Sequence, residues 1–150
     1  MEQFADVKNK KEYQARETER FIARHELADY KFNTHFPVNT LHLMRGAVFA
    51  SHHDYYALYI EAMYQCMWEQ GKDMSDLEVV AESLRAHGLS AEEIISGTQD
   101  PAIKQELINN TAQSAERGAF GSPTFFIGDE MYFGKDRLRE VEEEIIAQLG

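Results

Sequence analysis

Near its C-terminal end the chain reads Gly118-Ala-Phe-Gly-Ser-Pro-Thr-Phe-Phe-Ile-Gly-Asp-Glu-Met-Tyr-Phe-Gly-Lys-Asp-Arg137. The apolar run 124–127 and the run 130–133 predict two short strands, joined by a tight turn at Gly128 and Asp129. Pro123 has no N–H to give to a strand ladder, so it belongs at the start of the first strand. Helical spacing resumes over 136–149, with Asp136 in the first turn. This segment therefore predicts a strand-turn-strand-helix unit.

The sequence before this unit is mostly helical by its apolar spacing. We expect helices at 8–27, 40–50, 55–70, 74–87, 91–96 and 101–118. Ser75 with Glu78 and Ser90 with Glu93 have the spacing of capping boxes, and Pro101 after Asp100 is a third start signal. Pro37 makes 32–38 a loop.

The first and last of these helices each show an apolar side. The spacing predicts that these residues face inward: Tyr13, Phe21 and Ile22 in the first helix, and Leu138, Val141, Ile145 and Ile146 in the last.

The predicted strands are too few for a stable sheet. An isolated two-stranded hairpin is marginal in water, and the apolar strand 124–127 would leave one edge without hydrogen bonds. We therefore expect a further strand, which is either supplied by another chain or encoded upstream in a longer protein.

Length, charge and composition narrow the class of protein. The 150 residues are enough for one domain with its own core, and the formal net charge of −11 argues against nucleic-acid binding. No apolar run is long enough to span a membrane, and residues 1–11 are too polar for a signal peptide. We expect a cytoplasmic protein with no membrane partner.

Cys66 is the single cysteine, so the chain contains neither an internal disulfide nor a CxxC pair. It lies in an apolar helical stripe with Met63, Met67 and Trp68, and we expect nothing basic to adjoin it. We interpret it as a buried structural thiol. The stripe itself predicts core packing, with some of its tyrosines lining a substrate cleft.

Three motifs together resemble one known family. They are His35-Phe-Pro-Val-Asn-Thr-Leu-His-Leu-Met-Arg-Gly-Ala47, Arg117-Gly-Ala-Phe-Gly-Ser-Pro-Thr-Phe125 and Met131-Tyr-Phe-Gly-Lys-Asp-Arg-Leu138. In order and spacing they resemble the 2-hydroxychromene-2-carboxylate isomerase family, bacterial relatives of the kappa-class glutathione transferases in the DsbA-like branch of thioredoxin folds.

The resemblance implies an α/β, thioredoxin-like domain over 1–150. A large helical insertion at 8–118 would be followed by the ββα part of the fold at 119–150. Family members begin with a strand, a helix and a second strand that this sequence lacks, which would account for the expected missing strand. The helix carries a serine that contacts the glutathione sulfur, so the catalytic residue would lie upstream, and we expect residues 1–150 alone to be nearly inactive.

The resemblance also implies glutathione as cofactor, a small aromatic substrate and a homodimer. Lys10 resembles a lysine that contacts glutathione, although it also fits an exposed position on a charged helix. Ser122, before Pro123, resembles the residue whose main chain pairs with the cysteinyl unit, held in a pocket if the Ser122–Pro123 bond is cis. Lys135 and Asp136 resemble the pair that receives the γ-glutamyl end, while Asp136 could equally serve only the helix dipole.

On the substrate side, the resemblance points to Asn39 and His35. Asn39 is equally well placed to cap the helix that starts at Thr40. His52 and His53 fit a helix boundary, and we find no metal site.

Two other classes of function stay open. One is a DsbA-like thiol-disulfide oxidoreductase or a kappa-type glutathione transferase, which differ from the isomerases in the helix that this sequence lacks. The other is a non-catalytic helical protein that associates through its exposed strand. The motifs around Pro37 and Asp136 favour the isomerases.

Overall fold

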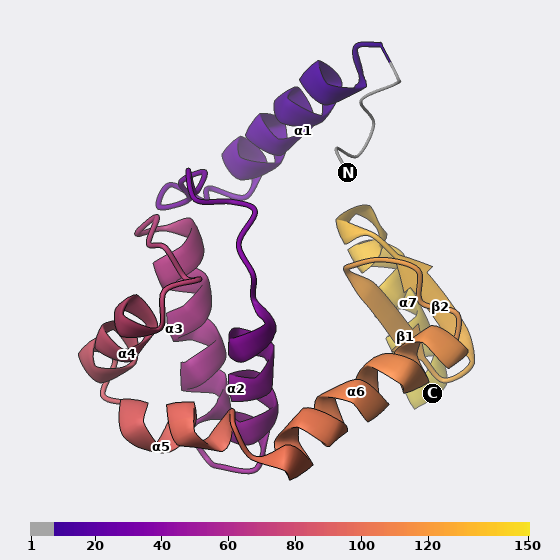
Figure 1. Cartoon of the computed structure of the whole chain (residues 1–150). Coiled ribbons are helices and arrows are strands. Elements are labelled where there is room, and N and C mark those ends of the chain that lie inside the picture. Colours follow the sequence, from indigo (N-terminus) through magenta and orange to yellow (C-terminus); the bar gives the residue numbers. More distant parts are fainter. Residues whose placement is uncertain (1–7) are drawn as a thin grey trace. The chain divides into compact units, whose positions relative to one another are not determined.

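The computed structural model describes residues 8–150, which form seven α-helices, two strands and one 3₁₀ turn (Figure 1). The elements are α1 (Lys10–Arg24), α2 (Leu41–Ser51), α3 (Tyr56–Trp68), α4 (Leu77–Ala86), α5 (Ala91–Gly97), α6 (Pro101–Glu116), β1 (Thr124–Ile127), β2 (Glu130–Phe133), the 3₁₀ turn η1 (Lys135–Arg137) and α7 (Leu138–Leu149). The two strands have the predicted bounds, and each predicted helix is present within a few residues.

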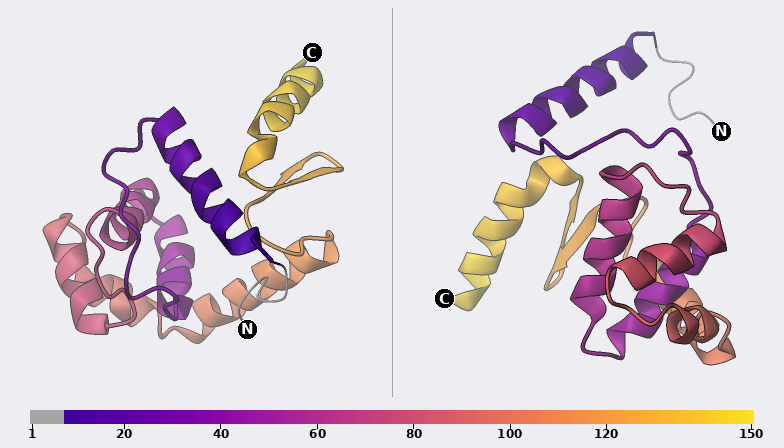
Figure 2. Two further views of the ribbon diagram at one scale, coloured as in Figure 1. Left: turned by 90° about the horizontal axis from the view of Figure 1, so that it is seen from above. Right: turned by 90° about the vertical axis from the view of Figure 1, so that its left-hand side faces the viewer.

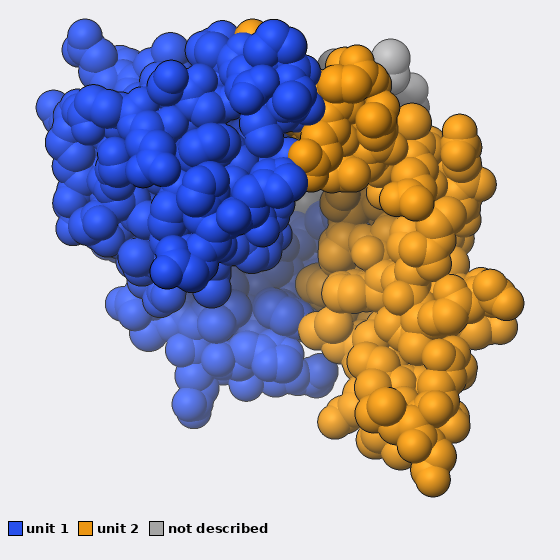
Figure 3. All heavy atoms as spheres, turned by 90° about the horizontal axis from the view of Figure 1, so that it is seen from below, with its two compact units in different colours: residues 1–103 blue, residues 104–150 orange. Residues whose placement is uncertain are grey.

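The chain divides into two compact units, at residues 1–103 and 104–150 (Figure 3). We call the first the helical unit and the second the hairpin unit. The division falls within α6, whose first three residues belong to the helical unit.

The core of the helical unit lies among α2, α3, α4 and α5, which contact one another in a ring of neighbours (Figures 1 and 2). Its largest fully buried side chains include Tyr59, Met74, Leu84 and Ile94. The predicted apolar stripe of α3 supplies much of this core, and Cys66 is buried in it as expected.

Two glycines let these helices approach closely. A Cβ at Gly46 on α2 would lie 2.2 Å from the hydroxyl oxygen of Tyr59, and a Cβ at Gly97 on α5 would lie 2.4 Å from the ring of Phe49. Close packing of α2 against α3 brings the Tyr59 hydroxyl to the carbonyl of Leu43, to which it donates at 2.9 Å. Burial raises the pKa of the Tyr59 phenol.

Asn33 fixes the loop between α1 and α2. Its fully buried amide donates to the carbonyl oxygens of Met67 at 2.9 Å and Lys72 at 2.8 Å, while its Oδ1 accepts from the amide of His35 at 2.8 Å. The Phe36–Pro37 bond in this loop is cis, which the sequence did not suggest. The loop expected from Pro37 is present, and the hydrogen bonds of Asn33 hold it against the helical unit.

The hairpin unit is built on the antiparallel pairing of β1 with β2, with Phe125 opposite Tyr132. Alternation along the strands places these two side chains on one sheet face, where α7 packs against β1. On the other face the Arg117 guanidinium lies 3.9 Å from the ring centre of Phe126. Gly128 has a φ of +56° in the turn, a conformation that favours glycine.

Two inward-facing predictions were wrong. In α7 only Val141 is buried, at 7% exposure, whereas Leu138, Ile145 and Ile146 are 49%, 42% and 64% exposed. In α1, Tyr13 is 62% exposed. Periodicity gives the apolar side of a helix, but whether that side is covered depends on what packs there.

The helix starts were predicted unequally well. Ser90 caps α5 and Asp100 accepts from the Ala102 amide at the start of α6, as expected. The Ser75 prediction was wrong, because Asp76 caps α4 by accepting from the Glu78 amide at 2.8 Å. Ser75 instead donates its hydroxyl to Asp73 at 2.6 Å.

Among residues 8–150, no helix combines the length and the hydrophobicity that crossing a lipid bilayer requires.

Candidate functional site

The register of the hairpin brings two of the predicted binding segments together. The amide of Gly134 donates to the carbonyl oxygen of Pro123 at 2.9 Å, which extends the ladder one pair beyond Thr124 and Phe133. Lys135 and Asp136 directly follow Gly134, so this bond ties the segment that carries them to the segment of Ser122 and Pro123. Gly134 makes this exit from the strand with a φ of +100°.

The start of β1, next to Ser122 and Pro123, has main-chain groups that point away from β2. Bonded and non-bonded pairs alternate in an antiparallel ladder, so the bonded pair at Pro123 places the N–H and C=O groups of Thr124 and Phe126 on the other edge. In the described part of the chain no strand pairs with that edge. The Ser122–Pro123 bond is cis. The edge thus offers main-chain donors and acceptors to an extended ligand.

Asp136 is an exposed member of an ion pair. Its Oδ1 contacts the Nζ of Lys135, and its side chain is 75% exposed. Both residues belong to η1, and α7 starts only at Leu138. The predicted place of Asp136 in the first turn of the last α-helix was therefore wrong, because Gly134 leads into a 3₁₀ turn first. The pair still offers one charge of each sign.

Lys10 lies in the first turn of α1 and is exposed. It belongs to the helical unit, whereas Ser122, Pro123, Lys135 and Asp136 belong to the hairpin unit.

The predicted substrate-side residues lie on the loop before α2. His35 approaches Asp73, with 3.6 Å between Nδ1 and Oδ2, and Asn39 Oδ1 accepts from the Leu41 amide at 3.0 Å. Asn39 therefore takes part in the start of α2, which was one of its two expected roles. Their neighbours Phe36, Val38 and Thr40 line a pocket that His35 and Asn39 do not line.

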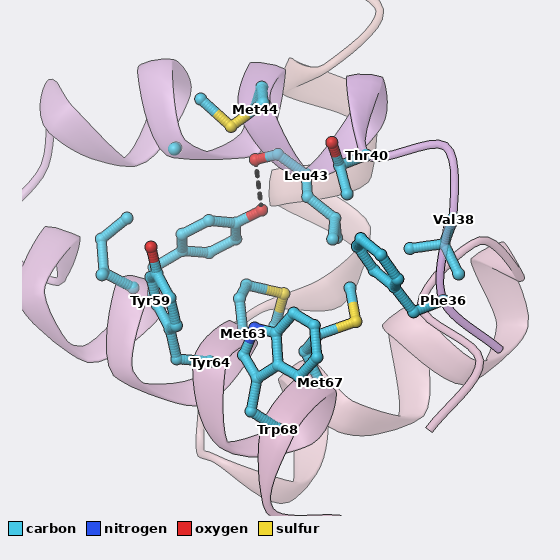
Figure 4. A pocket seen from close by; sticks show the side chains of 12 residues that line it. Phe36, Val38, Thr40, Leu43, Met44, Tyr59, Met63, Tyr64, Met67 and Trp68 are labelled. Carbon is cyan, nitrogen blue, oxygen red and sulfur yellow. Dashed lines mark hydrogen bonds between the residues drawn. The ribbon is translucent and has the colours of Figure 1, made fainter. Parts of the chain in front are cut away.

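This pocket lies within the helical unit and has a volume of about 210 Å³ (Figure 4). Loop 36–40, α2 and α3 supply its walls. The lining residues are Phe36, Val38, Thr40, Leu43, Met44, Ala47, Tyr59, Ile60, Met63, Tyr64, Met67 and Trp68. None of these side chains carries a charge.

Sequence reasoning found part of this pocket. The α3 stripe was expected to have tyrosines that line a cleft. Of its two tyrosines, Tyr59 lines the pocket and Tyr56 does not, and Tyr64 lines it as well. The contributions of Phe36, Met44 and Trp68 were missed. For Trp68 the sequence did carry a signal, because Trp68 follows Tyr64 by one helical turn. The opposite wall of the pocket includes loop 36–40, whose path cannot be predicted from the sequence.

The surroundings of Cys66 differ from those expected. Its Sγ lies 3.8 Å from the Nζ of Lys72, which also donates to the Ser83 hydroxyl at 3.0 Å. The expectation that nothing basic adjoins Cys66 was thus wrong, because the turn after α3 brings Lys72 back over it. The thiol is fully buried, in keeping with a structural role.

Comparison with known proteins gives relatives of one kind. A 2-hydroxychromene-2-carboxylate isomerase of Sphingobium xenophagum is 29% identical over 104 residues, which are 67% of this chain and 52% of that protein. One of Pseudomonas putida is 33% identical over 89 residues, covering 57% of this chain and 42% of that protein. The chain thus spans about half the length of these curated relatives.

A solved structure titled as a 2-hydroxychromene-2-carboxylate isomerase has the same fold, with a TM-score of 0.74 at 23% identity. The match covers 98% of this chain and 70% of that one. The profile of the DSBA-like thioredoxin domain matches residues 2–146. Its extent, together with the fold described above, shows that this chain belongs to the DsbA-like thioredoxin domain family.

Proposed function

We propose that this chain forms the glutathione-binding and substrate-binding parts of a glutathione-dependent cis-trans isomerase that acts on an aromatic compound such as 2-hydroxychromene-2-carboxylate. Its similarity to proteins of that name supports the reaction, and the hairpin unit supports the cofactor. Glutathione would supply the thiolate nucleophile.

The carrying observation is the pairing of Pro123 with Gly134. It ties the segment of Lys135 and Asp136 to the start of β1, whose other edge has main-chain groups that no described strand pairs. Glutathione has a peptide backbone, a carboxylate and an ammonium group at its γ-glutamyl end, so its backbone would pair with the edge, and Lys135 and Asp136 would pair with the carboxylate and the ammonium. Hydrogen bonds that involve an ionised partner are the stronger ones, which favours Asp136 as the anchor for the ammonium.

Equilibrium binding tests the cofactor without requiring turnover. Asp136→Asn removes the charge but keeps the size, and we expect glutathione to bind roughly 10- to 100-fold more weakly, the range of a lost charged hydrogen bond. Asp129→Asn, at an exposed aspartate of the same hairpin, is the matched control and should bind as the unchanged chain does. Isothermal titration calorimetry gives both constants.

Equal binding by the two variants would exclude Asp136 as an anchor, and absence of glutathione binding by the unchanged chain would contradict the proposed cofactor.

Isomerisation of 2-hydroxychromene-2-carboxylate, followed by absorbance with and without glutathione, tests the reaction. The expectation that residues 1–150 alone turn over little stays a prediction, which measurable turnover would contradict.

A second candidate is favoured by the free edge of β1. Unpaired main-chain groups along an apolar strand are a template for a strand of another chain. Self-association through this edge would give a homodimer. Size-exclusion chromatography with light scattering over a wide concentration range should then show a mass that rises with concentration, whereas a monomer throughout would argue against edge pairing.

A further inference from the structure

We propose that the apolar pocket of the helical unit binds the uncharged ring system of a flat aromatic molecule. The inference deepens the proposed function and rests on it only for the identity of the natural ligand. Binding itself follows from the walls of the pocket, all of which belong to the helical unit.

The volume fits a ring system. The pocket measures about 210 Å³, whereas an apolar protein cavity of about 150 Å³ is sufficient to bind benzene. There is thus room for one ring and part or all of a second, fused ring. Longer or bulkier ligands would have to extend past the mouth.

The exposure of the walls shows which side is open. Tyr59, Met63 and Met67 are no more than 7% exposed and form the buried floor. Phe36, Met44 and Tyr64 are 51%, 49% and 64% exposed and form the rim (Figure 4). A ligand can therefore enter from solvent with one end first and leave its other end between the rim residues.

The chemistry of the walls selects an aromatic guest without charge. Thioethers of methionine make favourable contacts with ring edges, and aromatic side chains favour tilted or offset rings. The rings of Phe36 and Trp68 lie 5.6 Å apart at 47° on one side of the pocket.

The buried floor of the pocket has no polar side-chain group available to a ligand. The hydroxyl of Tyr59 is already used by the Leu43 carbonyl, and no lining side chain carries a positive charge. An ionised group would lose its hydration without a partner, so it must stay outside. The pocket accordingly takes a ring system first, with any carboxylate held at or beyond the rim.

The methionines make this pocket observable. The chain has six, of which Met44, Met63 and Met67 line the pocket, while Met74 is buried elsewhere in the same unit and Met131 lies in the hairpin unit. An aromatic ring shifts the NMR signals of methyl groups near its faces and edges. Titration of ¹³C-methyl-methionine protein with naphthalene should shift the three pocket methyls and leave Met74 and Met131 in place.

The same titration with 2-naphthoate tests the exclusion of charge. We expect it to bind at least tenfold more weakly than naphthalene, because a carboxylate that must stay in solvent at the rim keeps the two rings from entering the pocket fully. Equal affinity would overturn the inference about charge, and absence of shifts at the pocket methyls with naphthalene would overturn the site.

Two variant pairs locate the site. Ala47→Leu fills the pocket and should weaken naphthalene binding at least tenfold, whereas Ala57→Leu, on an exposed part of α3, should not. Met44→Glu adds a charge at the rim and should weaken binding similarly. Its control is Leu41→Glu, at a non-lining residue of α2 whose 47% exposure matches the 49% of Met44.

If Ala47→Leu does not fold, shown by collapse of the methyl spectrum, the Met44 and Leu41 pair still decides. Equal effects within a pair would overturn the assignment. Naphthalene binding without glutathione binding would support the pocket and contradict the proposed cofactor, and the reverse would contradict the pocket alone.

Discussion

The two units differ in how they are held together. The helical unit has a cluster of buried side chains shared among four helices, whereas Val141 is the one buried residue described between 104 and 150. The hairpin unit relies on its ladder, on the Phe126 contact with Arg117 and on the half-buried contacts of α7 with β1. The walls of the pocket thus belong to a packed core, whereas the residues proposed to bind glutathione are held mainly by hydrogen bonds.

Truncating one isoleucine in each unit should give the largest difference in stability between the two units. Ile94→Ala removes a side chain that is 1% exposed, and we expect a loss of about 2–5 kcal/mol in the free energy of unfolding. Ile146→Ala removes the same atoms where exposure is 64%, and should change it by less than about 0.5 kcal/mol. Urea denaturation followed by circular dichroism measures both. Similar losses would mean that Ile146 is covered in solution.

The close approach of α2 to α3 gives the next effect. Gly46→Ala places a methyl group against the Tyr59 ring, and we expect a cost of about 1–3 kcal/mol. Tyr59→Phe removes the nearest atom, so the double variant should lose less than the sum of the two single changes. Additive losses in denaturation would contradict the tight contact.

The cap of α4 tests which residue starts that helix. Asp76→Ala removes the acceptor of the Glu78 amide and should cost about 1 kcal/mol in thermal or urea unfolding. Ser75→Ala is the control suggested by the sequence, and it should cost less because the Ser75 hydroxyl bonds Asp73 and no amide of α4. A larger loss of stability for Ser75→Ala than for Asp76→Ala would support the capping box predicted at Ser75.

The smallest effect is a dependence on pH. Hydrogen bonds from Ser75, with a further contribution from His35, hold the pKa of Asp73 below its usual value. A carboxyl whose pKa is depressed by folding stabilises above its unfolded pKa of 3.8, and the contribution is lost as the pH falls through the folded pKa.

Asp73→Asn should therefore flatten the loss of stability below about pH 4, measured by urea unfolding between pH 2.5 and 7. In the hairpin unit Glu140 also has a lowered pKa, through its own backbone hydrogen bond and Arg137, so Glu140→Gln is the corresponding test there. An unchanged acid limb for Asp73→Asn would contradict its linkage to folding.

Predictions from the sequence were correct wherever one local preference acts alone. The strands followed from the apolar runs beside Gly128 and Pro123, the start of α6 from Asp100 and Pro101, and the cap of α5 from Ser90. In each case the deciding atoms lie within three residues along the chain, so pattern and propensity suffice.

The errors share the opposite cause. Ser75 and Asp76 are both competent caps, and the choice between them depended on Asp73, which engages Ser75. Lys72 reached Cys66 only because the chain turns after α3, and Ile146 stayed exposed because nothing described covers it.

By itself, the sequence determined the order of the elements, the hairpin with Pro123 at its mouth and the resemblance that points to glutathione. Tertiary structure alone decided the pairing of Pro123 with Gly134, the 3₁₀ turn that carries Asp136 and the pocket walled by Phe36, Met44 and Trp68. The physical reason is range: hydrogen-bonding preferences and periodicity act between near neighbours, whereas a pocket exists only where distant segments pack and leave space between them.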